Sequence, residues 1–323
     1  MSTLYLDRRD LALKLEGRAL AIYTGGERHG TVPLHLLERV VMRSAVALES
    51  SLLARLADEG IAIQIHGGRF GGAVALVHGK SHGDAARRLG QYRAYADADW
   101  RRHWARLLVR AKLKGQARLL RQAREARPDQ RRPLTVGLER LNQALGHIAA
   151  VPTLSLESLR GVEGAAAAAY FQALTCLFAP ALNFSGRNRR PPRDPVNAVL
   201  SLAYTLVHCE AVRACHNAGL DPLIGFFHDL EYGRESLACD LVEPLRPWVD
   251  LWVWSLFRER RLTADHFDQA AASCLLGKAG REHFYAAFEP FARPQRRRLR
   301  RLSNGLAQGL LGRGQIAFTG EGA

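Results

Sequence analysis

The segment from residue 228 to 247, HDLEYGRESLACDLVEPLRP, carries an imidazole and two carboxylates at a spacing that suits metal binding. Asp240 and Glu243 lie three positions apart, so that on a helix their side chains share one face. Two carboxylates that close repel each other unless a cation lies between them, and His228 could supply a third ligand. Mg²⁺ and Mn²⁺ take oxygen ligands, and the more tolerant of such ions also accept imidazole. The segment therefore predicts half of a divalent metal site.

Glu163 is a candidate for the other half. It precedes a run of five alanines in a helix that the sequence predicts to be buried. An ionised carboxylate there would cost several kcal/mol without a partner, so it must pair with a cation or bind metal. An ion pair with one of the many arginines, for instance Arg160, is the structural alternative. Tyr170 lies on the same helix face and could point at the same site, or be a core tyrosine with a satisfied hydroxyl.

Ordinary explanations also exist for the segment after residue 228. A single histidine more often has a structural role, and acids in the first turn of a helix are favoured by the helix dipole. Arg246 follows Glu243 by three positions and could either neutralise a phosphate or pair with that acid. The acids and the histidine indicate one metal site better together than any does alone; the candidates are Glu163, His228, Asp240 and Glu243.

The chain is strongly basic, with 46 Lys and Arg against 31 Asp and Glu, a formal net charge of +15 and a pI near 10.3. Such an excess predicts a polyanionic partner, most plausibly nucleic acid. An anionic membrane and a compositional bias toward Arg and Ala are the alternatives. The sequence lacks a Walker loop, a G-x-G-x-x-G helix start, H-E-x-x-H and G-x-S-x-G, which argues against the enzyme classes that use them.

Cysteine usage and the N-terminus indicate a cytoplasmic protein. The five cysteines form no C-x-x-C pair, which argues against a disulfide framework or a structural zinc site. The first ten residues contain no apolar region typical of a secretory signal. The apolar segment 164–182 is rich in Ala and barely long enough to span a membrane, so we expect a buried core helix.

The order of secondary-structure patterns predicts an α+β protein with a β-rich N-terminal domain (1–82) and a helical C-terminal domain (83–323). Short strand-like runs are separated by glycine turns, and one helix at 49–59 interrupts them. The strand-like runs are 4–7, 11–15, 19–23 and 61–66.

From residue 85 onward the pattern is helical almost to the end. A cationic helix is expected over 85–124, and Ser155 and Asp194 are candidate N-caps. Gly219 is expected to end the helix that follows Asp194. The last long helices are predicted at 236–258 and 294–311.

A basic loop at 184–195, FSGRNRRPPRDP, precedes the helix that Asp194 caps. Its arginines could contact a phosphate backbone, or the loop could be a mobile surface segment. The arginines concerned are Arg187, Arg189 and Arg190.

Three segments together resemble a known family. They are LRGVEGAAAAAYF (159–171), GRNRRPPRDPVNAVLSLAYTL (186–206) and GFFHDLEYGRESLACDLVEPLRP (225–247). The chain resembles the CRISPR-associated endonuclease that integrates new spacers in the CRISPR adaptation module. The resemblance implies a homodimer held mainly through the N-terminal domains, bound to a small ferredoxin-like partner protein, with double-stranded DNA as substrate.

The resemblance also implies residue roles. Glu163, His228 and the acidic motif would hold Mg²⁺ or Mn²⁺. Asp240 would be the more usual third ligand, with Glu243 close by, because the type of the second acid varies within the family. Arg246 would lie near the DNA. The expected activity is metal-dependent endonuclease and integrase chemistry, in which a 3′-hydroxyl attacks a phosphodiester at a CRISPR repeat.

Two alternatives remain open. A non-catalytic DNA-binding scaffold of the same fold would use the acids only to pair with arginines. The other is a helical-bundle carboxylate metalloenzyme that acts on small molecules. The sequence lacks the paired E-x-x-H motifs of that class, which argues against it.

Overall fold

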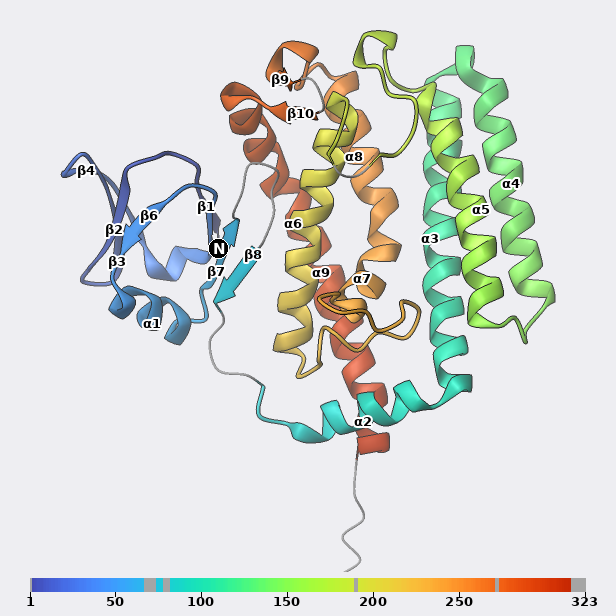
Figure 1. The fold of residues 1–323 in the computed structure, drawn as a ribbon, viewed down its shortest axis with the longest axis horizontal. Coiled ribbons are helices and arrows are strands. Elements are labelled where there is room, and N and C mark those ends of the chain that lie inside the picture. Colours follow the sequence, from blue (N-terminus) through green and yellow to red (C-terminus); the bar gives the residue numbers. More distant parts are fainter. Residues whose placement is uncertain (1, 67–73, 78–81, 189–190, 271–272, 315–323) are drawn as a thin grey trace, which may run out of the picture. The chain divides into compact units, whose positions relative to one another are not determined.

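The computed structural model describes residues 2–66, 74–77, 82–188, 191–270 and 273–314. The chain divides into two units, residues 1–81 and 82–323 (Figure 1). The first is β-rich and the second mostly helical, so the predicted α+β class is confirmed.

The N-terminal unit contains two four-stranded sheets. One has the order β1-β5-β7-β8, in which β1, β5 and β7 are parallel, and the other has the order β4-β3-β2-β6. Leu13, Leu20, Val40, Leu56 and Ile63 belong to the hydrophobic core of this unit. Its elements are β1 (Ser2–Leu6), β2 (Leu11–Glu16), β3 (Ala19–Thr24), β4 (Glu27–Pro33), β5 (Leu37–Met42), β6 (Val46–Leu48), α1 (Ser50–Asp58), β7 (Ala62–His66) and β8 (Val74–Val77).

All four predicted strand runs are strands, and the predicted helix at 49–59 is α1. Four further strands were not predicted: β4, β5, β6 and β8. β4 has the sequence ERHGTVP, which lacks alternating apolar residues, and it lies at the edge of its sheet. It forms an antiparallel hairpin with β3, and none of its side chains is fully buried, so no apolar alternation marks it as a strand.

The candidate site residues all belong to the C-terminal unit, whose long helices run side by side (Figure 1). α3 packs against α4 and α5, while α6 packs against α7, α8 and α9. The elements are α2 (Ala85–Ala96), α3 (Ala98–Ala126), α4 (Arg131–Ala150), α5 (Leu156–Thr175), α6 (Pro195–Asn217), α7 (Ser236–Val242), α8 (Arg246–Arg258), β9 (Phe267–Ala270), β10 (Ser273–Leu276) and α9 (Lys278–Gly314).

Both predicted N-caps are confirmed. The hydroxyl of Ser155 accepts from the backbone N–H of Ser158 at 3.1 Å, and the carboxylate of Asp194 accepts from that of Asn197 at 2.8 Å. Gly219 follows the end of α6 with φ +76°, as a helix-ending glycine often does.

Three helix predictions were wrong in their boundaries. The cationic segment is two helices, because Asp97 accepts from the N–H groups of Asp99 and Trp100 and starts α3 anew. The predicted helix 236–258 is interrupted at Glu243–Leu245 by a 3₁₀ turn, where Pro244 lacks the N–H that an α-helix would need. α9 begins at Lys278 and continues through Pro290 and Pro294.

A β-hairpin of β9 and β10 also lies where only helix was expected. α9 tolerates its prolines because Phe284, Phe288 and Ala292 are buried around them, and this packing outweighs the lost backbone bonds.

The alanine-rich helix is less buried than predicted. α5 ends at Thr175, and Gly164, Ala165 and Ala168 are exposed, while Ala166 and Ala173 are buried. Its small residues serve close packing on one side: a Cβ added at Gly137 of α4 would lie 2.5 Å from the Cβ of Ala173.

Within the described residues, α6 is the helix long and apolar enough to span a membrane by length and composition. Of its apolar window, 61% is buried inside the protein, as expected of a core helix.

Candidate functional site

Asp240 of α7 organises the loop that carries His228. Its side chain is fully buried and accepts four hydrogen bonds. The backbone N–H groups of Phe226 and Phe227 donate to Oδ2 at 2.6 and 2.9 Å. The backbone N–H and Nδ1 of His228 donate to Oδ1 at 3.0 and 2.7 Å. One carboxylate thus fixes both the backbone and the ring of His228, and it leaves Nε2 for another partner.

Two arginines hold the other side of the same loop. Arg160 of α5 donates to the carbonyl of Phe227 at 2.6 Å, and Arg101 of α3 donates to that of Phe226 at 3.3 Å. Both also pair with Asp229, at 2.6 and 2.9 Å. Arg160, given as an example of an ion-pair partner for Glu163, instead binds this loop, and the cation that pairs with Glu163 is Lys112.

Gly225 lets the loop approach the start of α7. A Cβ at this position would lie 2.6 Å from the backbone carbon of Ser236 and 2.7 Å from its carbonyl oxygen. No side chain fits there without displacing backbone, so the glycine is required on steric grounds.

Glu163 and Glu243 meet at the ammonium of Lys112. The Nζ atom lies 2.5 Å from Oε1 of Glu163 and 2.5 Å from Oε2 of Glu243. The side chain of Glu243 is 5% exposed and that of Lys112 10% exposed. Burial alone would lower the pKa of Lys112, but the charges of Glu243 and Glu163 outweigh it and raise that pKa above its usual value. α3, α5 and the turn after α7 thus bring one cation and two carboxylates together.

Arg246 holds the second oxygen of Glu243. Its Nε donates to Oε1 of Glu243 at 2.6 Å. Burial alone would raise the pKa of Glu243, but the charges of Arg246 and Lys112 hold it well below its usual value, and His228 adds to this lowering. Of the two roles considered for Arg246, pairing with Glu243 is the one observed.

Asp240 and Glu243, three positions apart, bind different partners. α7 ends at Val242, so Glu243 starts the 3₁₀ turn and its carboxylate turns toward Lys112. Asp240 instead lies under the loop around His228. The two acids therefore have different partners, although the backbone angles of Val242, Glu243 and Arg246 remain helical.

Tyr170 does not join this group. It is fully buried, and its hydroxyl donates to Asp250 of α8 at 2.8 Å. Tyr204 donates to the other oxygen of Asp250 and lies under the guanidinium of Arg246, whose centre is 4.7 Å from the ring centroid. Of the two roles considered for Tyr170, the structure shows the core tyrosine with a satisfied hydroxyl and not the site-facing one. The acid that it satisfies, Asp250, also holds Tyr204, which lies beneath Arg246.

Arg187 is engaged with the start of α6. It donates to the side chains of Asn197 at 2.7 Å and Ser201 at 3.0 Å, and its guanidinium lies over the ring of Tyr204. In this conformation it anchors the basic loop. Arg189 and Arg190 lie outside the described residues.

Among the residues that the structure describes, no group of three or more His, Cys, Asp or Glu side chains is arranged to hold a metal ion. The chemistry of the donors does fit Mg²⁺ or Mn²⁺. Lys112 already places a positive charge between Glu163 and Glu243, and Nε2 of His228 is the ring atom left for another partner. Movement of the ammonium away from these carboxylates would free one oxygen of each for a divalent ion.

Lys112 and Asp250 are the residues that sequence reasoning missed. Lys112 was treated as one of many surface cations, although Leu108 and Gln116, one turn to either side, are also buried. Asp250 interrupts the apolar run WVDLWVW in α8. A charged residue on an apolar helix face was the available signal in both cases.

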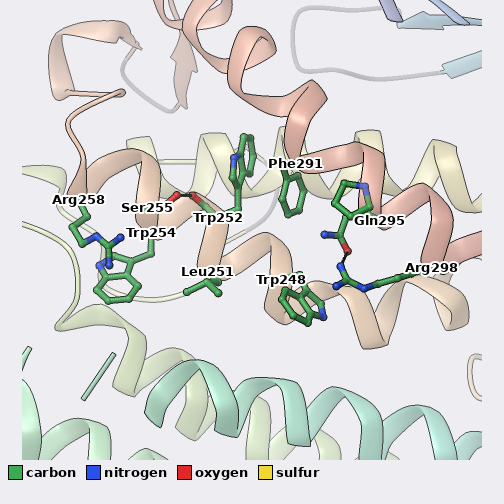
Figure 2. A pocket seen from close by; sticks show the side chains of 10 residues that line it. Trp248, Leu251, Trp252, Trp254, Ser255, Arg258, Phe291, Gln295 and Arg298 are labelled. Carbon is green, nitrogen blue, oxygen red and sulfur yellow. Dashed lines mark hydrogen bonds between the residues drawn. The ribbon is translucent and has the colours of Figure 1, made fainter. Parts of the chain in front are cut away.

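A separate groove lies between α8 and α9, with a volume of about 400 Å³ (Figure 2). The rings of Trp252 and Phe291 stack in it with centroids 4.7 Å apart, and Arg298 lies 4.2 Å from the centroid of Trp248. Rings and arginines line it, with no carboxylate among its described lining residues. The groove is therefore suited to aromatic or anionic groups and not to a metal.

Comparison with known proteins identifies the family. A family model described as CRISPR associated protein Cas1 matches residues 4–290. The CRISPR-associated endonuclease Cas1 1 of Thermodesulfovibrio yellowstonii is 38% identical over 313 residues, which cover 96% of this chain and 98% of that protein.

Solved structures share the fold. A CAS1 protein from Thermotoga maritima superposes with a TM-score of 0.83 at 22% identity, covering 100% of both chains. A casposase bound to integration product gives 0.78 at 20% identity, covering 96% of this chain and 91% of that one. A chain of a Cas6-RT-Cas1–Cas2 complex gives 0.78 at 19% identity, covering 99% of this chain and 36% of that one. The sequence match over nearly the whole length establishes that the chain belongs to the CRISPR-associated Cas1 family.

Proposed function

We propose that this chain is a metal-dependent DNA endonuclease and integrase that inserts short foreign DNA fragments into a CRISPR array. Membership of the Cas1 family supports a nuclease or integrase acting in CRISPR adaptation. The observation that carries the proposal is the meeting of Glu163 and Glu243 at one buried cation, beside a histidine that Asp240 holds by Nδ1. These acids come from distant parts of the chain and meet where α3, α5 and the turn after α7 pack together.

Glu163, Glu243 and Nε2 of His228 would hold Mg²⁺ or Mn²⁺. When bound, the divalent cation supplies Lewis-acid polarisation of the phosphate and stabilises charge on the attacking and leaving oxygens. The resemblance ranks Asp240 ahead of Glu243 as a direct metal ligand. We propose the opposite order, because both oxygens of Asp240 already accept hydrogen bonds from the loop. Asp240 then acts by positioning His228, as partners of metal-bound histidines commonly do.

The reaction we propose is a transesterification. The 3′-oxygen of the fragment forms a bond to phosphorus at a repeat end, and the bond from phosphorus to the leaving oxygen breaks. The proton lost by the attacking hydroxyl balances the one gained by the leaving alcohol, so no nucleotide or redox partner is needed. Lys112 and Arg246 are the buried cations beside the acids, and their charges are suited to neutralising the non-bridging phosphate oxygens.

The wider assembly follows from the family. We propose that the chain works as a homodimer through its N-terminal unit and binds double-stranded DNA and a small ferredoxin-like adaptation protein. The similarity to a chain from a complex named for Cas1 and Cas2 supports the partner. Binding to the DNA backbone by a chain of net charge +15 would be strongly salt-dependent.

A non-catalytic DNA-binding scaffold is the second candidate. The observation that favours it is the Lys112 pairing itself, since both acids already have a counter-ion without metal.

The two candidates differ in the behaviour of Glu163→Gln. We would incubate the protein with fragment DNA, a repeat-bearing plasmid and Mg²⁺ or Mn²⁺, with and without EDTA, and measure both DNA binding and strand transfer. Integration should require metal and be lost in Glu163→Gln while DNA binding persists. Glu157→Gln, an exposed acid on the same helix, should behave as wild type. Undiminished strand transfer in Glu163→Gln would reject the site.

A further inference from the structure

Lys112 occupies the position between the acids that a bridging metal would need. Its Nζ lies 2.5 Å from an oxygen of each of Glu163 and Glu243. Mg²⁺ binds carboxylate oxygens at roughly 2.0–2.1 Å. An ion at such a distance from both oxygens would overlap the ammonium or lie in direct repulsion with it. The two cations therefore exclude each other from this pair of carboxylates.

We propose that Lys112 is an internal cation that competes with the divalent metal: it bridges Glu163 and Glu243 until metal binds and must leave at least one of them when metal arrives. The inference rests on the proposed metal-dependent function and concerns the regulation of that same site. It assigns Lys112 the role of a displaceable counter-ion, which differs from the roles of the acids and the histidine.

The charges around the site explain why such a cation is needed. Arg246 pairs with one oxygen of Glu243, and Lys112 is the described cation that pairs with Glu163. Removing Lys112 would leave the Glu163 carboxylate, whose side chain is only 16% exposed, facing Glu243 across the site. Breaking a buried pair by removing one partner is strongly destabilising. The ammonium therefore keeps the two acids in place before metal is present.

Lysine is also the residue type suited to exchange. Its ammonium is a compact charge on a flexible four-carbon stem, whereas the planar guanidinium of Arg246 is fixed by Glu243 on one side and the Tyr204 ring on the other. α3 passes close to α8 beside Lys112, since a Cβ on Gly115 would lie 2.9 Å from Pro247. A displaced ammonium remains next to the site, where a DNA phosphate is the anion that can receive it.

The test is a calorimetric titration of Mn²⁺ into the full-length protein without DNA. Lys112→Met removes the charge and keeps the length of the side chain. Its Mn²⁺ dissociation constant should be at least tenfold lower than that of wild type, because no ammonium has to be displaced. Lys114→Met, an exposed lysine on the same helix, should match wild type. Equal or weaker Mn²⁺ binding by Lys112→Met would overturn the proposal.

A second readout covers the chance that Lys112→Met folds poorly. Thermal unfolding in EDTA should occur at a lower temperature in Lys112→Met and in Lys112→Gln than in wild type, and Mn²⁺ should raise it by more in both variants. An equal Mn²⁺-induced shift in wild type and both variants would also overturn the competition.

Glu163→Gln separates this inference from the proposed function. If wild type binds Mn²⁺ and Glu163→Gln does not, the metal site stands, and an unchanged Lys112→Met rejects only the competition. If neither wild type nor Lys112→Met binds Mn²⁺, the metal site itself is rejected, and the competition with it.

Discussion

Nδ1 of His228 lies 2.7 Å from Oδ1 of Asp240, and the same oxygen receives the backbone N–H of His228 at 3.0 Å. A single buried carboxylate therefore sets the position and the orientation of the imidazole. This arrangement separates the role of Asp240 from that of Glu243, although the two acids are three positions apart.

Asp240→Asn should impair both the site and the fold. An amide cannot accept from all four donors, so a ring or backbone N–H loses its partner, at about 1–3 kcal/mol in the free energy of unfolding. Loss of ring orientation should lower integration by about 10–100-fold. Urea unfolding and strand-transfer rates measure the two effects, with the exposed Asp265→Asn as control. A fully active, fully stable Asp240→Asn would contradict the positioning role.

Glu243→Gln should abolish Mn²⁺ binding more completely than Asp240→Asn, because Glu243 offers its carboxylate to the site and Asp240 does not. Isothermal titration with Mn²⁺ compares them directly. Weaker Mn²⁺ binding by Asp240→Asn than by Glu243→Gln would instead indicate that Asp240 is the direct ligand.

Gly225→Ala should displace the loop that carries His228. The new methyl would lie 2.6 Å from backbone of Ser236, and such overpacking costs roughly 1–3 kcal/mol. Strand transfer should fall together with the free energy of unfolding. Gly146→Ala is the matched control, because that glycine is exposed on α4 with nothing within 4 Å of its added Cβ. It should stabilise the protein by up to about 1 kcal/mol.

Tyr170→Phe should affect stability and leave chemistry nearly unchanged. The variant removes one of the two hydroxyl donors to buried Asp250, at a cost of about 1–3 kcal/mol. Strand transfer per folded molecule should stay within about twofold of wild type, in contrast to Glu163→Gln. A large loss of strand transfer without loss of stability would place Tyr170 in the site after all.

Asp250 should make stability depend on pH. Burial raises its pKa from 3.8 to about 6, against the hydrogen bonds from Tyr204 and Tyr170. Because the folded state favours the protonated acid, its contribution to stability is fully present below pH 3.8 and is lost as pH rises to about 6. Relative to Asp250→Asn, wild type should lose on the order of 3 kcal/mol across that window.

Urea unfolding of wild type and Asp250→Asn between pH 4 and 7 measures this difference. Parallel stability curves for the two proteins would show that the buried acid has no raised pKa.

Local sequence determined the parts of the fold that depend on neighbouring residues. Ser155 and Asp194 start helices through hydrogen bonds within three residues, and the strand runs near the N-terminus follow local alternation and glycine turns. The same local information identified Glu163, His228, Asp240 and Glu243 as the residues with potential for chemistry. It did not show that Asp240 and Glu243 have different partners, because Glu243 finds its cation 131 positions away in the chain.

Only tertiary structure decided which of these residues meet. Lys112 joins Glu163 across 51 positions and Glu243 across 131, and Tyr170 joins Asp250 across 80. The sequence could mark Lys112 as a charge on an apolar face, but its partners follow from how α3, α5 and α8 pack. A buried charge must find an opposite charge or a donor, and which one it finds depends on contacts between helices that no local pattern records.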